Sequence, residues 1–136
     1  MKFKNYKVAV YLRTAHKDNS AIEKQKKLID FYCRTKGYPK IVNTYQDNGY
    51  SGTTENRPAF KKMLKDIKKG KINAIVVTDI SRLTRQPILF YHKMNNYIVN
   101  EKLIIIDVLD NKLFDFELFN LVSKEVLNLK TNGGVI

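Results

Sequence analysis

Four arginines stand just beyond apolar stretches of this sequence, which makes them the residues best placed to do chemistry. They are Arg13, Arg57, Arg82 and Arg85. A guanidinium donates two parallel hydrogen bonds to phosphate oxygens and keeps its charge when it is partly desolvated. A cluster of this kind would stabilise the charge that develops on non-bridging oxygens during phosphoryl transfer. The residues therefore predict a phosphate site, and we expect one of the four arginines to form a structural ion pair instead, with Asp47, Glu55 or Asp79.

The phosphate is predicted to belong to a polymer backbone. No glycine-rich loop of the mononucleotide or dinucleotide type follows the first apolar stretch. The net charge is +12 and the sequence pI is about 9.8. This charge favours a polyanionic partner, with nucleic acid ahead of a membrane surface because no long apolar segment is present. On charge alone, a lysine-rich solvated surface is an equal alternative.

The spacing of apolar residues predicts alternating strands and helices that would bring the arginines together. Strands are predicted at 8–15, 41–45, 74–77 and 103–109. Helices are predicted from an N-cap at Ser20 to Gly37, from Pro58 to Gly70, from Pro87 onward, and over about 115–129. This alternation predicts an α/β fold, a three-layer sandwich with a mostly parallel sheet of about four strands flanked by helices. The loops after the first three strands would meet at one edge of the sheet.

Composition limits the other classes of site. With 136 residues, 43% of them hydrophobic and 28% charged, the chain is expected to form one globular domain over 1–136. The lone Cys33 excludes an internal disulfide and a cysteine-rich zinc site, and its apolar helical stripe predicts a buried thiol. His16 and His92 lack ligand spacing, so no metal or cofactor is predicted. The N-terminus has no apolar signal core, which predicts a cytoplasmic protein without a membrane segment.

Three ordered motifs add to the arginine pattern. They are Tyr11-Leu12-Arg13-Thr14-Ala15, then Asp47-Asn48-Gly49-Tyr50-Ser51-Gly52 with Asn56-Arg57-Pro58-Ala59-Phe60, then Asp79-Ile80-Ser81-Arg82-Leu83-Thr84-Arg85. They resemble the Tyr-x-Arg-Val-Ser, Asp-x-Gly-x-Ser-Gly with Arg-Pro-Ala, and Asp-Arg-Leu-x-Arg segments of the serine recombinase catalytic domain, found in resolvases, invertases and large serine integrases. Gln25 falls on the glutamine of that family's first helix. The resemblance spans about Lys7 to Asp110, and the shared order and spacing make it specific.

The resemblance implies a protein that cuts DNA with a serine hydroxyl, holds the end as a phosphoserine ester, and rejoins exchanged strands without metal or ATP. By position, Arg13, Arg82 and Arg85 would bind the scissile phosphate and help to activate the nucleophile and the leaving group. Arg57 would be a further phosphate contact. Supporting residues around the pocket would be Tyr11, Gln25, Asp47, Ser51 and Asp79. For Tyr11 and Gln25, a role in packing is an equal alternative.

The family's nucleophile position holds Ala15 in this chain. A methyl group can neither attack phosphorus nor carry a covalent intermediate, so the domain is predicted to be inactive. Thr14 is adjacent, but neighbouring side chains in an extended segment point to opposite sides. Ser20 and Ser51 would each need the loop to rearrange. A natural loss and an engineered replacement of serine both stay open, and Thr14 in place of the family's valine favours the natural loss.

Members of the family follow this domain with a long helix and a separate DNA-binding module, and we expect neither here. DNA affinity should then be weak, come from phosphate contacts, and fall steeply with salt. The predicted last helix is apolar on more than one side, through Phe114, Phe116, Leu118, Phe119, Leu121 and Val122. Such a surface is either buried twice or used for self-association, and the resemblance implies a homodimer or a higher oligomer.

Three functions remain in view from the sequence. The first is a DNA-directed serine recombinase domain with a disabled catalytic position. The second is a non-catalytic DNA-binding or regulatory partner that joins an active recombinase in mixed oligomers. The third is a small-molecule enzyme of flavodoxin-like fold whose arginines bind a phosphorylated ligand.

Overall fold

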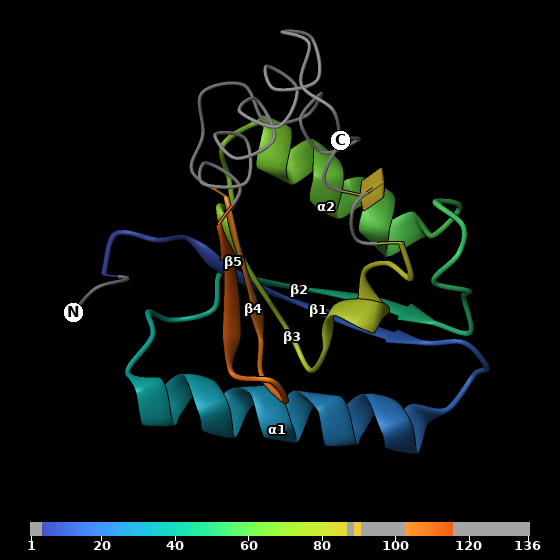
Figure 1. Ribbon diagram of the computed structural model, residues 1–136, viewed down its shortest axis with the longest axis horizontal. Helices are drawn as coiled ribbons and strands as arrows, with labels where there is room; N and C mark the ends of the chain where they lie inside the picture. Colours follow the sequence, from blue (N-terminus) through green and yellow to red (C-terminus); the bar gives the residue numbers. More distant parts are fainter. Residues whose placement is uncertain (1–3, 87–88, 91–102, 116–136) are drawn as a thin grey trace, which may run out of the picture.

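A central sheet organises the chain in the computed structural model, which describes residues 4–86, 89–90 and 103–115 (Figure 1). The elements in chain order are β1 (Val8–Thr14), α1 (Asn19–Lys36), β2 (Asn43–Asn48), α2 (Pro58–Lys68), β3 (Ala74–Val77), the short 3-10 helix η1 (Ile80–Arg82), β4 (Ile104–Asp107) and β5 (Lys112–Asp115). The strand order is β2-β1-β3-β4-β5. Neighbours among β1 to β4 are parallel, and β5 pairs with β4 in the antiparallel sense. The predicted α/β fold with a mostly parallel sheet is confirmed.

Strand β1 lies inside the sheet, between β2 and β3, and all of its residues are buried. It pairs with β2 as far as Thr14, which lies opposite Asn48, but with β3 only as far as Val10, opposite Val76. The end of β1 therefore runs past its pairing with β3. The segment that follows β3, including η1, contacts β1 at this edge.

Helices α1 and α2 cover opposite faces of the sheet and form the outer layers of the described structure (Figure 1). On one face, α1 packs Ile22, Ile29 and Cys33 against the side chains of β1 that point its way, such as Val10 and Leu12. On the other face, the buried residues of α2 pack against the intervening side chains of β1 and β3; this cluster includes Ala9, Tyr11, Phe60, Met63, Ile67, Ile75 and Val77. Alternate residues of β1 and β3 therefore pack into the hydrophobic clusters on opposite faces of the sheet, as expected for pleated strands.

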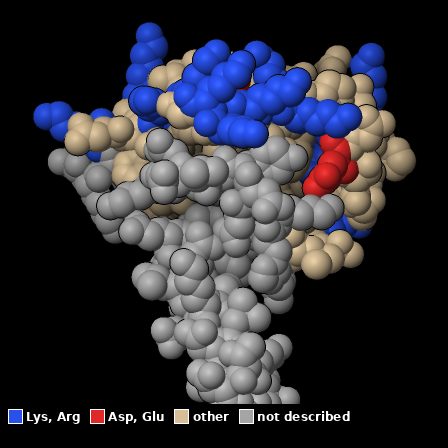
Figure 2. Space-filling model, turned by 90° about the horizontal axis from the view of Figure 1, so that it is seen from above, with Lys and Arg blue, Asp and Glu red and all other residues tan. Residues whose placement is uncertain are grey.

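The outer side of α2 carries lysines. Lysine and arginine side chains gather into one patch on the face shown in Figure 2, which looks down on the α2 side of the molecule. The apolar stripe predicted for this helix is buried, and Gly70, with a φ of 73°, follows its C-cap Lys69. Gly37 likewise ends α1 in the left-handed conformation, where its N–H reaches carbonyls of the last turn.

Two predicted boundaries were wrong because short polar side chains decide them. The N-cap of α1 is Asp18 and not Ser20, since the Asp18 carboxylate accepts a hydrogen bond of 3.0 Å from the Ala21 N–H. Strand β2 covers Asn43–Asn48 and not 41–45. It lies at the edge of the sheet and buries only alternate residues, Tyr45 and Asp47, so the apolar residues ahead of it suggested the wrong register.

Among the described residues the sheet has five strands, where about four were predicted. The missed strand, β5, contains Phe114, which the sequence had suggested as part of a final helix. A turn precedes it, with Asn111 at a φ of 51°, and turns the chain back along β4. A strand that pairs in the antiparallel sense after a short turn can be short and partly polar. The four residues of β5 therefore gave no clear strand pattern in the sequence. The rest of that final helix, and most of the helix predicted from Pro87, lie outside the described residues.

Candidate phosphate site

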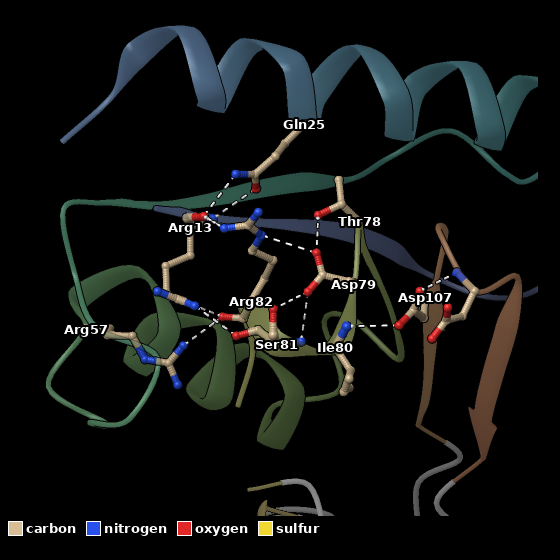
Figure 3. Close-up of polar contacts among 10 residues, drawn as sticks. Arg13, Gln25, Arg57, Thr78, Asp79, Ile80, Ser81, Arg82 and Asp107 are labelled. Carbon is tan, nitrogen blue, oxygen red and sulfur yellow. Dashed lines mark hydrogen bonds and ion pairs between the residues drawn. The ribbon is translucent and has the colours of Figure 1, made fainter. Parts of the chain in front are cut away.

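Arg13 is the penultimate residue of β1, and its buried side chain carries a guanidinium that binds backbone carbonyls (Figure 3). Its Nε donates to the Arg82 carbonyl at 2.8 Å, Nη1 to the Tyr50 carbonyl at 2.9 Å, and Nη2 to the Ser81 carbonyl at 2.8 Å. Burial, and then the positive charge of Arg57, lower the pKa of Arg13. The planar fork therefore ties the end of β1 to the loop after β2 and to η1.

The close approach of the loop to Arg13 requires a glycine. A Cβ at Gly52 would lie 2.7 Å from Nη2 and 2.9 Å from Cζ of Arg13, and 3.2 Å from the Ser81 carbonyl oxygen. A side chain at this position would push the guanidinium away from its carbonyl partners. The absence of a side chain at Gly52 therefore allows the loop to pack directly against the Arg13 guanidinium.

Arg57 lies just before α2 and is also buried, with 2% of its surface exposed. Its Nη2 donates to the Leu83 carbonyl at 2.6 Å and its Nε to the Thr54 carbonyl at 2.8 Å. Its Nη1 lies 3.1 Å from the Arg82 carbonyl, the same oxygen that Arg13 binds. The guanidinium carbon stands 3.9 Å from the centre of the Phe60 ring, a cation–π contact.

Arg82 is the partly open arginine of the cluster, with 32% of its side chain exposed. Its Nη1 donates to the Arg13 carbonyl at 3.1 Å, so Arg13 and Arg82 bind each other's backbone. Its Nε lies 3.4 Å from Asp79 Oδ2 and is buried without a hydrogen bond. This is the type of ion pair that the sequence predicted for one of the four arginines. Arg85 is exposed, and its charge also lowers the pKa of Arg13, after burial and the charges of Arg57 and Arg82.

Two carboxylates shape the segment that carries Arg82. Asp79 caps η1 by accepting the Ser81 N–H at 3.1 Å, and it also contacts the Ser81 hydroxyl. The fully buried Asp107, at the end of β4, accepts the Ile80 N–H at 3.0 Å (Figure 3). Neighbouring strands therefore fix both the start and the direction of η1.

Tyr11, Asp47 and Gln25 stabilise the backbone around the arginines. The Tyr11 hydroxyl donates to Asp47 Oδ2 at 2.7 Å, and burial raises the pKa of this tyrosine. Asp47 also accepts the N–H groups of Ala59 and Phe60, both at 2.9 Å, so it caps α2 from β2. From α1, the Gln25 amide accepts the Arg13 N–H at 3.2 Å and donates to the Arg13 carbonyl at 2.9 Å.

Ala15 lies in an exposed bend immediately after β1, two residues beyond Arg13. The neighbouring Thr14 is buried, and its hydroxyl donates to Asn48 Oδ1 at 2.6 Å and accepts the Gly49 N–H at 3.2 Å. Ser51 is exposed and exchanges a hydrogen bond of 2.8 Å with the Thr53 hydroxyl. Ser20 is exposed in the first turn of α1. The predicted site residues thus gather at one edge of the sheet, where the exposed residue 15 presents only a methyl group.

The family of this chain follows from a comparison with known sequences. The profile of the family described as "Resolvase, N terminal domain" matches residues 8–118. The chain belongs to this serine recombinase family. A putative DNA recombinase of Bacillus subtilis (strain 168) is 30% identical over 100 residues, which cover 71% of this chain and 18% of that protein. The part of this resolvase-type chain that matches therefore covers less than a fifth of the length of that relative.

Solved structures agree with the resolvase fold. The N-terminal catalytic domain of TP901-1 integrase superposes with a TM-score of 0.70 at 21% identity, covering 93% of this chain and 97% of that chain. A resolvase family site-specific recombinase from Streptococcus pneumoniae gives a TM-score of 0.63 at 25% identity, covering 93% of each chain. No helix in the described part of the resolvase-type domain is long and apolar enough to cross a membrane.

The sequence did not reveal three residues that shape the resolvase-type site: Gly52 as an individual contact, Thr78 and Asp107. The Thr78 hydroxyl donates to Asp79 Oδ2 at 3.2 Å. Asp107 accepts a second N–H, from Asp110, at 2.9 Å. The available signal was an acidic residue that interrupts the apolar stretch 103–109 at the carboxyl edge of the sheet, where ligands of such folds bind.

Proposed function

We propose that this chain is a DNA-directed serine recombinase domain that keeps a phosphate-binding arginine cluster and lacks its nucleophile. The observation that supports it most directly is the interlocked arrangement of three arginines beside Ala15. The Arg82 carbonyl accepts hydrogen bonds from both Arg13 and Arg57, and the Arg82 side chain returns one to Arg13. This arrangement is built at the edge where the family motifs meet.

The arginines divide into two roles under this proposal. The exposed Arg85 and the partly exposed Arg82 bind the scissile phosphate directly, because their guanidiniums have donors left to offer. Arg13 and Arg57 hold the loop and η1 through backbone carbonyls, and their buried charges add a positive field to the same edge. Each reaches phosphate itself only when its carbonyl partners move.

Inactivity follows from the chemistry of residue 15. In the family reaction, a serine Oγ forms a bond to phosphorus while the bond from phosphorus to a deoxyribose oxygen breaks, and the leaving oxygen takes up a proton. Ala15 has no oxygen to form that ester. Thr14 cannot replace it without giving up its hydrogen bonds to Asn48 and Gly49. The partners under this proposal are DNA, bound weakly through phosphates, and a second copy of the chain.

A non-catalytic partner of an active recombinase is the second candidate function. It is favoured by the guanidiniums of Arg13 and Arg57, which serve backbone carbonyls and so keep the domain folded without any catalytic use. Formation of mixed oligomers with an active serine recombinase, measured by co-purification of two differently tagged chains, would distinguish this role from DNA binding by the chain alone.

The test of the proposed function restores the hydroxyl. The unsubstituted chain, Ala15→Ser and Ala15→Gly are each incubated with a randomised pool of duplex DNA, and covalent protein–DNA product is measured on a denaturing gel. We expect an adduct only from Ala15→Ser, and its loss when Arg85→Gln is added. An adduct from the unsubstituted chain would refute the inactive state. No adduct from Ala15→Ser, in a protein that still binds the pool, would refute the intact pocket and favour the partner role.

A further inference from the structure

Helix α2 has a basic face that the arginine site does not use. Its buried side carries Phe60, Met63, Leu64 and Ile67. All four lysines of the helix, and two in the segment that follows it, are exposed. We call this set the α2 lysine face: Lys61, Lys62, Lys65, Lys68, Lys69 and Lys71.

The charge of this face is left largely unneutralised. The one acidic residue between 58 and 71 is Asp66, which is 5% exposed and accepts the Tyr45 hydroxyl at 2.5 Å. The three ion pairs found among the described residues lie elsewhere, two of them on α1. Lys61, Lys65 and Lys69 follow one another at a spacing of four residues, where like charges destabilise an isolated helix. A polyanion bound to this face would relieve the repulsion between these lysines.

The composition of the face fits a nucleic acid better than an acidic protein. Protein interfaces have an apolar or aromatic centre within a polar rim. Apart from Pro58 at its start, every exposed residue of α2 is a lysine, and Figure 2 shows lysine and arginine side chains gathered into one patch on this side of the molecule. A lysine is a hydrated point charge on a flexible stem, which suits phosphates and reads no base pattern.

The dimensions of the face also match a duplex. The helix rises about 1.5 Å per residue, so the row from Lys61 to Lys69 is about 12 Å long. A duplex carries one phosphate charge for about every 1.7 Å of its axis. The row therefore faces enough phosphates for each lysine to release a counterion.

The α2 lysine face leads away from the arginine site. The helix begins after Arg57, at the edge where β1 and β3 end, and runs back across the sheet (Figure 1). Lys71 precedes the start of β3, whereas Arg82 follows its end. A duplex on this face would contact the part of α2 beyond Phe60 and the segment before β3, which the arginine site does not contain.

We propose that the α2 lysine face is a second, sequence-independent contact for the phosphate backbone of duplex DNA. The proposal shares its ligand class with the proposed function, but it depends on neither the arginines nor a nucleophile. In a protein whose arginine site is partly closed by its own carbonyls, this face supplies most of the affinity for DNA.

The test compares two triple variants that lose the same charge. Lys61→Gln with Lys65→Gln and Lys68→Gln alters the face, and Lys24→Gln with Lys27→Gln and Lys40→Gln alters exposed lysines on and after α1. Binding of a labelled random-sequence duplex is measured by fluorescence anisotropy over a series of NaCl concentrations. We expect the first variant to lose on the order of a hundredfold in affinity at low salt and its log–log salt slope to fall by about 3. The second variant should change only a few-fold.

Two further results decide the proposal. Substituting arginine at the same three α2 positions keeps the charge and should keep both affinity and slope. Equal losses in the two glutamine variants would mean that net charge alone attracts DNA, and no loss in the first would mean that DNA does not contact α2; either result overturns the proposal. Because anisotropy needs no cleavage, a missing covalent adduct from Ala15→Ser would leave this result unaffected.

Discussion

Positive charge serves opposite purposes at the arginine site and on the α2 lysine face. At the arginine site, guanidiniums turn inward and bind backbone carbonyls of segments far apart in the sequence. On α2, ammonium groups turn outward and have no ion-pair partner among the described residues. A guanidinium is weakly hydrated and offers a rigid fork, whereas an ammonium group keeps its water. The same formal charge therefore works as a cross-link in one region and as an electrostatic surface in the other.

The largest expected effect separates two arginines of the same cluster. Arg57→Ala leaves the Thr54 and Leu83 carbonyls without their donors in a buried place, which should lower the free energy of unfolding by about 3 kcal/mol. Arg85→Ala removes an exposed side chain and should change stability by less than about 0.5 kcal/mol. Urea denaturation measures both values.

A larger loss of stability in Arg85→Ala than in Arg57→Ala would contradict the division into buried and exposed arginines. A stable Arg57→Ala protein would mean that the buried fork is not a cross-link. A strongly destabilised Arg85→Ala protein would place the exposed arginine in the structural group.

An intermediate effect is expected where the loop touches Arg13. Gly52→Ala places a methyl group within 2.7 Å of the guanidinium, which must leave its carbonyl partners or push the loop outward. We expect a loss of about 2 kcal/mol in urea denaturation, within the usual range for overpacking. Ser51→Ala, one residue earlier on the exposed loop, is the matched control and should cost far less. Equal stability of both variants would show that the loop does not depend on this contact.

The smallest effect concerns Asp66, the carboxylate beneath the α2 lysine face. The Tyr45 hydrogen bond, and then the charges of nearby lysines, hold the pKa of Asp66 below its usual range against the opposing effect of burial. A pKa that is depressed in the folded state stabilises the protein fully above the unfolded value of about 4, and this stability is lost as the pH falls through the folded value. The stability advantage of the unsubstituted chain over Asp66→Asn should therefore shrink in acid.

Denaturation of the Asp66→Asn variant at several pH values measures this difference. Asp30→Asn, which alters an exposed ion pair with Arg34, provides the control and should change stability little. A stability difference for Asp66→Asn that stays constant through the acid range would contradict the assignment.

The sequence predicted the elements whose buried side chains are apolar, and it misplaced or missed features whose buried side chains are polar. The apolar run 74–77 predicted strand β3. Helical spacing of apolar residues and a terminal glycine predicted the helix that ends at Gly37. Strand β2 buries Tyr45 and Asp47 at an edge, so its composition is that of a loop. Asp107 was hidden within an apolar stretch because nothing local shows that its carboxylate must cap η1.

At the candidate site, the sequence predicted which loops meet but not how their side chains are used. The position of Arg13 follows from its place at the end of a buried strand. That its three hydrogen bonds go to the carbonyls of Tyr50, Ser81 and Arg82 depends on the path of two loops, which no spacing rule specifies. The roles carried over from the family remain predictions about phosphate contact.

The buried thiol of Cys33 should react little with thiol-specific reagents. It is the one cysteine of the chain, and burial raises its pKa to about 11, so it holds almost no thiolate at neutral pH. An exposed cysteine has a pKa near 8.5, and its thiolate fraction is larger by a factor on the order of a few hundred. With Ala15→Cys, alkylating reagents would therefore mark residue 15 and leave Cys33 unmodified. A spectroscopic label attached there would report whether DNA approaches the exposed bend that follows β1.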